Sequence, residues 1–196
     1  MSAQLESRRF NVAEYHQMAN AGVLKPDDRV ELLDGEVIQM SPIGSPHAAC
    51  VTRSADALRR LVRKMAIVWV QNPVRLDDFS EPLPDIALLK PRKDYYASRH
   101  PLPKDVLLII EVADVTLLKD RNVKIPMYGR AGIPEAWLIN LPKQQIEVYS
   151  ELVKGRYRKY MKFKRGESLV SPNLPRLSLE VAALLGQTIQ FRNKTK

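Results

Sequence analysis

The stretch that decides the fold is Val106-Leu-Leu-Ile-Ile-Glu-Val112, in one-letter code VLLIIEV. Five consecutive apolar residues precede the acid, so a strand here has no polar face. A strand that is apolar on both faces is typical of the centre of a parallel or mixed sheet covered by helices on both sides. The stretch therefore predicts an α/β fold, and it puts Glu111 at the end of the most buried strand.

Glu111 is unusual because an uncompensated charge on such a strand costs several kcal/mol. The side chain therefore needs a cation close by. Two partners satisfy that need: a bound metal ion, which points to a functional site, or an arginine, which points to a structural salt bridge. The strand by itself leaves both readings open.

Further β-rich runs lie on both sides of this strand, bounded by turn residues. They cover residues 67–70, 74–76 and 86–89 before it, and 136–140, 146–150 and 157–163 after it. Lys154-Gly155 separates the last two runs and predicts a hairpin. Seven Lys and Arg residues lie between 154 and 165, so this C-terminal hairpin is basic.

Four local patterns predict the remaining elements. Asn11 followed by Glu14 is a capping box for a helix that runs to about Gly22. Asp34-Gly35 favours a type I′ turn between strands at 30–33 and 37–40. Residues 47–65 repeat apolar side chains at helical spacing. Residues 117–131 have helical character as well, with Pro126 either kinking the helix or lying close to its start.

The composition sets the broad class of protein. The length of 196 residues, with 45% hydrophobic and 27% charged residues, fits one globular domain over 1–196. The net charge of +9 suits a phosphate backbone or another anionic surface as partner. No apolar stretch approaches the ~20 residues of a membrane span, so we expect a soluble, cytoplasmic protein. Cys50 is the single cysteine, which excludes an intrachain disulfide and a cysteine-based zinc cluster.

Asp85 is a second candidate acid. It follows Pro84 at the head of the run 86–89, where a β-poor residue is unexpected unless a turn or a ligand requires it. Two carboxylates on adjacent strands can hold a hard cation, and a lysine can orient the attacking water of a nuclease. Lys124 lies in the helical stretch after Glu111, and a helix folding back over the sheet could aim it at the strand end.

Two segments, PDIALLKPRKDYY from Pro84 and LLIIEVADVTLLKDRNVKIPMYGRAGIPEAWLIN from Leu107, resemble the Uma-type family of putative restriction endonucleases. That family belongs to the PD-(D/E)XK nuclease superfamily, and the similarity covers most of the chain. The resemblance implies a restriction-endonuclease-like mixed sheet flanked by helices, with an N-terminal helix and hairpin, a nuclease core at about 28–163 and the basic hairpin as an extension.

The resemblance also implies roles for particular residues. Pro84-Asp85 matches the PD element and Glu111 the second acid, while position 113 is alanine and the lysine is met on the following helix as Lys124. Asp85, Glu111 and the Val112 carbonyl would then hold Mg²⁺ or Mn²⁺, and Lys124 would position the water. The family's further acid and histidine are matched by Glu31 in ELLDGE and by His47 after the SP turn.

These observations leave two functions open. The first is a divalent-metal-dependent endonuclease that hydrolyses DNA phosphodiester bonds, for which a homodimer would suit the cutting of two strands. The second is a nucleic-acid-binding or protein-interaction module on the same fold with weak or no turnover. Asp120, four residues before Lys124, either positions that lysine or forms an ordinary surface pair with it.

Overall fold

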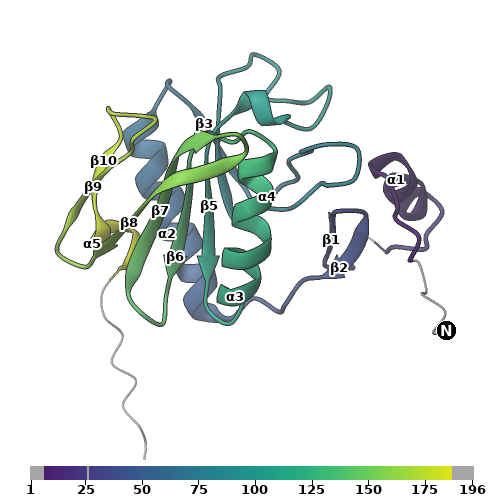
Figure 1. The fold of residues 1–196 in the computed structure, drawn as a ribbon, viewed down its shortest axis with the longest axis horizontal. Coiled ribbons are helices and arrows are strands. Elements are labelled where there is room, and N and C mark those ends of the chain that lie inside the picture. Colours follow the sequence, from purple (N-terminus) through teal and green to yellow (C-terminus); the bar gives the residue numbers. More distant parts are fainter. Residues whose placement is uncertain (1–6, 26, 187–196) are drawn as a thin grey trace, which may run out of the picture.

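A computed structural model of the chain describes residues 7–25 and 27–186, and its centre is a six-stranded mixed sheet (Figure 1). The strand order is β3-β4-β5-β6-β7-β8. The bounds are β3 Ile67–Val70, β4 Ile86–Leu89, β5 Val106–Ala113, β6 Ala136–Asn140, β7 Gln145–Val153 and β8 Arg156–Lys164. Only the β5–β6 pair is parallel, and the other neighbours are antiparallel. The predicted mixed α/β fold is confirmed.

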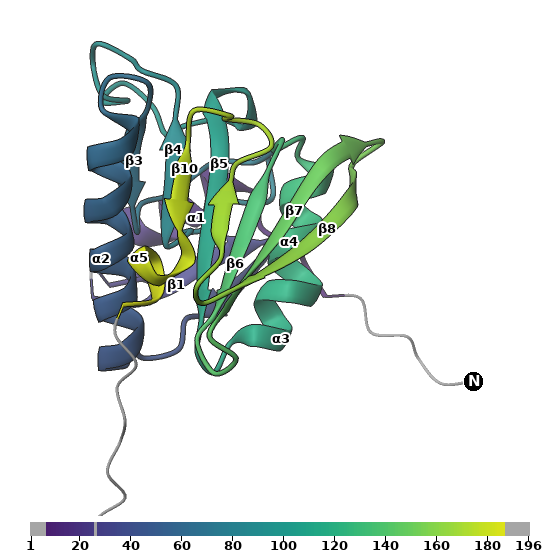
Figure 2. The ribbon, with the colours of Figure 1, turned by 90° about the vertical axis from the view of Figure 1, so that its left-hand side faces the viewer.

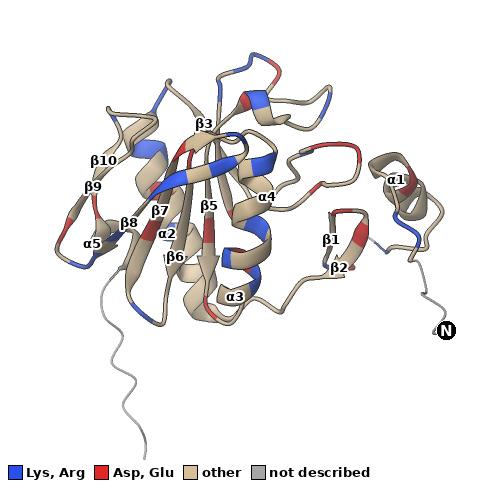
Figure 3. Ribbon diagram, viewed as in Figure 1, with Lys and Arg blue, Asp and Glu red and all other residues tan. Residues whose placement is uncertain are grey.

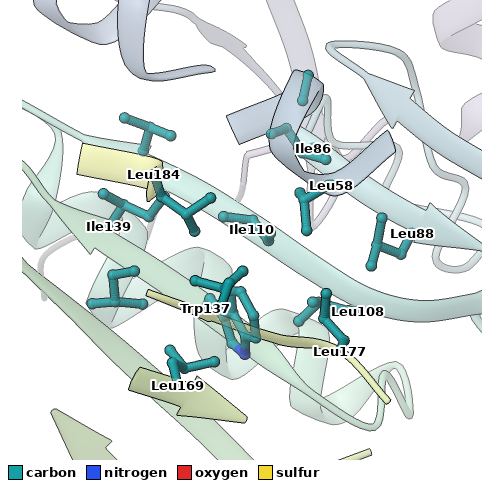
Figure 4. Packing of buried hydrophobic residues seen from close by; sticks show 14 of the residues in the cluster. Leu58, Ile86, Leu88, Leu108, Ile110, Trp137, Ile139, Leu169, Leu177 and Leu184 are labelled. Atoms are coloured by element: carbon teal, nitrogen blue, oxygen red, sulfur yellow. The ribbon is translucent and has the colours of Figure 1, made fainter. Parts of the chain in front are cut away.

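Strand β5 lies inside the sheet, as its apolar sequence predicts, and seven of its eight residues are buried. Its side chains alternate between two cores. Leu108 and Ile110 face a core formed with α2 (Ser45–Val62) and α5 (Val181–Leu185), whereas Ile109 faces a core formed with α4 (Ile125–Arg130). Figure 2 shows α2 and α4 on opposite sides of the sheet, and Figure 4 shows the α2 side, packed around Trp137.

The N-terminal elements have the form that the sequence predicts. Helix α1 (Val12–Asn20) begins at the Asn11–Glu14 capping box, in which each side chain bonds the backbone of the other residue. Strands β1 (Val30–Leu33) and β2 (Glu36–Gln39) form the predicted hairpin. Asp34 and Gly35 have φ angles of 47° and 82°, the positive values that a type I′ turn requires. The hairpin stands apart from the main sheet, beside α1 (Figure 1).

The predicted strand at 74–76 is wrong, because this segment is a loop. Its amides bond loop carbonyls at three separate places: Val74 to Pro82, Arg75 to Pro101 and Leu76 to Ser80. Val74 is fully buried all the same, which explains its apolar character without a sheet partner. The apolar side chains of Val74 and Leu76 are thus explained by burial in the core, and not by a strand.

The predicted helix at 117–131 is present, but it is not uniform. It consists of α3 (Leu117–Lys119), a π-helical turn η2 (Asp120–Lys124) and α4, with Pro126 in the first turn of α4. Proline has no amide hydrogen and its ring crowds the carbonyl four residues earlier, so regular α-helical bonding cannot pass through it. The wider turn before Pro126 accommodates this defect, and π-helical turns of this kind are frequent at functional sites.

Residues after the expected core at 28–163 also pack against the sheet. Strands β9 (Ser168–Val170) and β10 (Ser178–Glu180) pair with each other, and α5 follows them directly. Leu169, Leu179 and Leu184 belong to the same buried cluster as α2. A short 3-10 turn, η1 (Pro103–Asp105), leads into β5. Within the described residues, no helix is both long and apolar enough to cross a membrane.

Candidate metal and catalytic site

A single pocket gathers the residues that the sequence put forward. It lies where β5 ends, between the start of α2, the β1–β2 hairpin and the turn η2. Its lining includes Glu31, His47, Asp85, Glu111, Val112 and Lys124. The segments that supply them are far apart in the sequence, and the sheet register explains how two of them meet. Ile86 pairs with Ile110, so continuing that antiparallel register by one residue sets Asp85 opposite Glu111.

Asp85 is held by three hydrogen bonds. Its Oδ2 lies 3.0 Å from His47 Nε2 and accepts from the Val112 amide at 2.9 Å, while Oδ1 accepts from Gln71 Nε2 at 3.2 Å. Burial alone would raise the pKa of Asp85, but the bonds from His47 and Val112 and the nearby charge of Lys124 outweigh it and lower the pKa. Asp85 is therefore ionised at neutral pH.

His47 lies in the first turn of α2 and connects that helix to Asp85. Because the ionised Asp85 only accepts hydrogen bonds, His47 Nε2 is the donor. The other ring nitrogen, Nδ1, is buried and has no hydrogen-bond partner among the described residues. Burial lowers the pKa of His47, but Asp85, Asp120 and Asp114 outweigh this and raise it. The imidazole thus fixes the orientation of Asp85 and leaves one polar atom available to a bound group.

Glu111 is 2% exposed, and only one of its oxygens is engaged by the protein. Its Oε1 lies 2.8 Å from Lys124 Nζ and also accepts a short hydrogen bond from the Tyr128 hydroxyl. Its Oε2 accepts no hydrogen bond from any described residue. Burial raises the pKa of Glu111 to about 8, opposed by Lys124 and reinforced by the neighbouring Asp85 and Asp120. A second cation near Glu111 would favour its ionised form.

Lys124 is 4% exposed and joins two acids from different elements. Its Nζ lies 2.8 Å from Glu111 Oε1 and 3.3 Å from Glu31 Oε2. Burial would lower the pKa of Lys124, but Glu111, Glu31 and Asp120 together outweigh it and raise the pKa. The lysine therefore stays charged. An ammonium carries three donors, so after these two contacts one N–H remains for a water or a phosphate oxygen.

Glu31 is 1% exposed, so the hairpin does not turn this side chain to solvent. Its Oε1 lies 2.8 Å from Lys119 Nζ, and Oε2 also accepts from the Leu83 amide at 3.2 Å. Burial raises its pKa, but Lys124 and Lys119 outweigh burial and lower it. Both oxygens of Glu31 are thus occupied by Lys119, Lys124 and the Leu83 amide, which makes Glu31 a support for the two lysines.

Asp120 is also buried and accepts a hydrogen bond from Thr116 Oγ1 at 2.5 Å, so it is not part of an exposed surface pair. Three contributors to the site were missed in the sequence: Gln71, Lys119 as a partner of Glu31, and Tyr128. Tyr128 lies one helical turn after Lys124, so its position on the same face could have identified it. Gln71 gives no such signal, because its contact depends on the pairing of β3 with β4.

The donor set fits a divalent cation. Two carboxylates and a main-chain carbonyl are hard oxygen ligands of the kind that Mg²⁺ and Mn²⁺ prefer. Glu111 Oε2 is free of protein hydrogen bonds, and Val112 lines the same pocket as both acids. The residues that would hold the ion are therefore Asp85, Glu111 and the Val112 carbonyl.

The sequence was compared with protein families. A family named Uma2, described as "Putative restriction endonuclease", matches residues 12–182. The chain belongs to this family. The match includes all six residues put forward for the site, and it extends beyond the predicted core at 28–163 on both sides. No curated protein matches the chain at a significant level.

Comparison with solved structures gives the same fold. The crystal structure of a putative nuclease belonging to DUF820, from Anabaena variabilis, aligns with a TM-score of 0.67. The alignment covers 90% of this chain and 97% of the other, at 16% sequence identity. A similarity at this identity establishes the shared fold, and the family membership supports a nuclease function in general terms.

Proposed function

We propose that this Uma2-family protein is a divalent-metal-dependent endonuclease that hydrolyses DNA phosphodiester bonds. The observation that carries the proposal is the convergence of Asp85, Glu111 and Lys124 on one pocket, with a carboxylate oxygen left free by the protein. A buried cluster of this kind is costly for the fold alone, which makes a functional role the better explanation.

A divalent cation bound by Asp85 and Glu111 would polarise the scissile phosphate and lower the pKa of a coordinated water. The protein groups then have distinct tasks. His47 and the Val112 amide hold the Asp85 carboxylate in place. Tyr128 holds Glu111, and Glu31 holds the ammonium of Lys124. The remaining N–H of Lys124 is suited to orient the attacking water or to bond a non-bridging phosphate oxygen.

DNA is the proposed substrate because the chain carries a net charge of +9. Figure 3 shows Lys and Arg along β8 and along the stretch from α3 to α4. Phosphate contacts of this type release counterions, so the logarithm of the affinity should fall linearly with the logarithm of the salt concentration. An affinity for duplex DNA that is the same at low and moderate salt would contradict DNA as the partner.

The decisive experiment combines a nicking assay on supercoiled DNA with calorimetric titration of Mn²⁺. Asp85→Asn removes a ligand charge at constant volume, and we expect it to lose both Mn²⁺ binding and Mg²⁺-dependent cleavage. Lys124→Ala should keep Mn²⁺ binding while single-turnover cleavage falls by about two to four orders of magnitude. Lys143→Ala, at an exposed lysine outside the pocket, is the matched control and should cleave like the parent.

The same experiment separates the enzyme from a binding module on the same fold. A parent protein that binds DNA but cleaves none of the substrates with Mg²⁺ or Mn²⁺ would support the binding module. Cleavage by Asp85→Asn at the parental rate would show that the proposed site is wrong. Loss of metal affinity in Lys124→Ala would assign the lysine to assembly of the site.

A further inference from the structure

Three side chains with metal-binding donors meet on the side of the molecule that carries α1. They are His16 of α1, Glu81 of the loop before β4 and His100 of the loop before η1. One donor atom from each lies within 4.8 Å of the others. His16 and His100 are two of the three histidines in the chain, and neither was expected to have a role.

The environment of Glu81 is a further indication that a ligand binds here, in addition to the convergence of the three donors. It is 2% exposed, and its Oε1 lies 2.7 Å from His16 Nε2. Its other oxygen, Oε2, is buried and has no hydrogen-bond partner among the described residues. A buried carboxylate oxygen without a hydrogen-bond partner is unfavourable, because it has lost its contacts with water and gained none from the protein. The hydrogen bond with His16 satisfies Oε1 of Glu81 and leaves Oε2 without a partner among the described residues.

The charges around this cluster do not exclude a cation. The same hollow is lined by Arg75 and Arg99, but each is paired with a carboxylate. Arg75 Nη2 lies 2.8 Å from Asp78 Oδ1, and Arg99 Nη1 lies 2.7 Å from Asp105 Oδ2. Asp77 also lines the hollow. The carboxylates thus offset the arginines, and Glu81 adds a negative charge where the two imidazoles converge.

We propose that His16, Glu81 and His100 bind a transition-metal ion of the Zn²⁺ type, at a site separate from the acidic pocket. Two imidazoles and one carboxylate are typical ligands of Zn²⁺, whereas Mg²⁺ prefers oxygen ligands alone. Donor atoms around a tetrahedral Zn²⁺ are roughly 3.3 Å apart, given bonds of about 2.0 Å. His16, whose side chain is 45% exposed, can make the small rotation that closes the remaining distance.

The location indicates what the ion does. The three ligands come from α1 and from two loops, so a bound ion cross-links the N-terminal helix to the main body. Glu81 also forms a backbone bridge with Leu32 of β1, next to Glu31 of the acidic pocket, through a bond of 2.8 Å from the Glu81 amide to the Leu32 carbonyl. The ion therefore stabilises the strand that supports Lys124, without itself contacting the substrate.

The test uses the full-length His47→Gln protein, so that His16 and His100 are the only histidines present. Co²⁺ serves as the probe because its visible absorption reports nitrogen ligation, and excess Mg²⁺ keeps oxygen-only sites occupied. We expect one Co²⁺ per chain with nitrogen ligation. Adding His16→Gln, Glu81→Gln or His100→Gln should weaken Co²⁺ binding at least about tenfold. Asp56→Asn, an exposed acid on α2, is the matched control and should leave it unchanged.

A second measurement is independent of the spectrum. Zn²⁺ at about 100 times its Kd should raise the Tm of the His47→Gln protein by about 5–10 °C, and each ligand substitution should abolish this rise. If Glu81→Gln fails to fold, the His16→Gln and His100→Gln variants, at less buried positions, decide the question. Absence of nitrogen-ligated Co²⁺, or equal affinity in both of those variants and the parent, would overturn the proposal.

Discussion

Glu111 and Glu147 occupy the same row of the sheet, and their surroundings differ in one decisive respect. Leu138 of β6 pairs with Glu111 on one side and with Glu147 on the other. Both glutamates are buried, and both receive a basic side chain from the turn η2. Lys124 reaches Glu111, and Arg121, three residues earlier, reaches Glu147.

Each carboxylate oxygen of Glu147 accepts two hydrogen bonds from protein side chains, so we call this acid saturated. Arg121 bonds both of its oxygens, at 2.5 Å to Oε1 and 3.1 Å to Oε2. Gln145 adds a bond to Oε1 at 3.1 Å, and Tyr149 adds one to Oε2 at 2.8 Å. Glu111, in contrast, keeps Oε2 free and faces a pocket. The planar guanidinium of Arg121 bonds both oxygens of Glu147, whereas the ammonium of Lys124 contacts one oxygen of Glu111 and leaves the other available to another cation. Of these two glutamates, the one that faces the pocket is the one whose partners leave a carboxylate oxygen free.

The largest expected effect separates these two acids by activity. Glu111→Gln should reduce Mg²⁺-dependent cleavage by at least about 10²–10³-fold, because it removes a ligand charge from the proposed metal site. Glu147→Gln should retain cleavage while the protein is folded, since both of its oxygens are committed to the fold. Single-turnover cleavage at a temperature well below both Tm values measures the difference. Equal losses in the two variants would remove the distinction between them.

The second prediction compares the two basic partners by stability. Arg121→Met leaves the buried Glu147 charge without its main partner, which should cost about 3–5 kcal/mol in the free energy of unfolding. Lys124→Met should cost less, about 1 kcal/mol, because Glu111 can take up a proton and Glu31 keeps Lys119. Denaturant unfolding of both variants tests this order. A larger loss in Lys124→Met would mean that Lys124 is mainly structural.

Much of this arrangement could be predicted from the sequence, and the reason differs from residue to residue. Glu111 stands out because an acid interrupts a fully apolar strand. Glu147 does not, because Ile146-Glu-Val148 alternates as a half-exposed strand does, and it is Arg121, from a distant turn, that covers the acid. The convergence of Glu31, His47 and Asp85 depends on how separate segments pack. Before the structure, only the family resemblance could indicate that these three residues share one site.

The helical stretch after β5 shows a further limit. Pro126 predicted a defect near this point, but not a π-helical turn that directs both Arg121 and Lys124 towards the sheet. Likewise, Val74 and Leu76 favoured a strand at 74–76, and nothing in the sequence could reveal that the amides of this segment bond loop carbonyls. The sequence specifies which side chains are buried more directly than it specifies which backbone partners they meet.

The third prediction concerns Tyr128, which is the only neutral side chain among the described residues that bonds Glu111. Tyr128→Phe removes the hydroxyl and leaves the ring packed in the core, so the Glu111 carboxylate loses one of its two restraints. We expect Mn²⁺ affinity to fall about tenfold, the lower end of the range for partners that orient a metal ligand. Tyr149→Phe, which removes the corresponding hydroxyl from Glu147, is the control and should leave Mn²⁺ affinity unchanged. Equal Mn²⁺ affinity in Tyr128→Phe and the parent would show that Lys124 alone orients Glu111.

The smallest expected effect is the pH dependence of stability due to Glu147. Burial raises the pKa of Glu147, but the bonds from Arg121 and Tyr149 outweigh it and set the pKa below its ordinary value of 4.5. The folded state therefore holds the proton less tightly than the unfolded state. The resulting stabilisation is fully present above pH 4.5 and is lost as the pH falls through the lower, folded-state pKa. Glu147→Gln should thus lose less stability than the parent between about pH 5 and pH 3, as measured by urea unfolding at each pH.

Glu151→Gln, at an exposed position of the same strand, is the control, and its stability should change with pH as that of the parent does. Parallel curves for the parent and Glu147→Gln would contradict a charged Glu147 in the folded protein, and with it the contrast between the saturated and the incomplete acid.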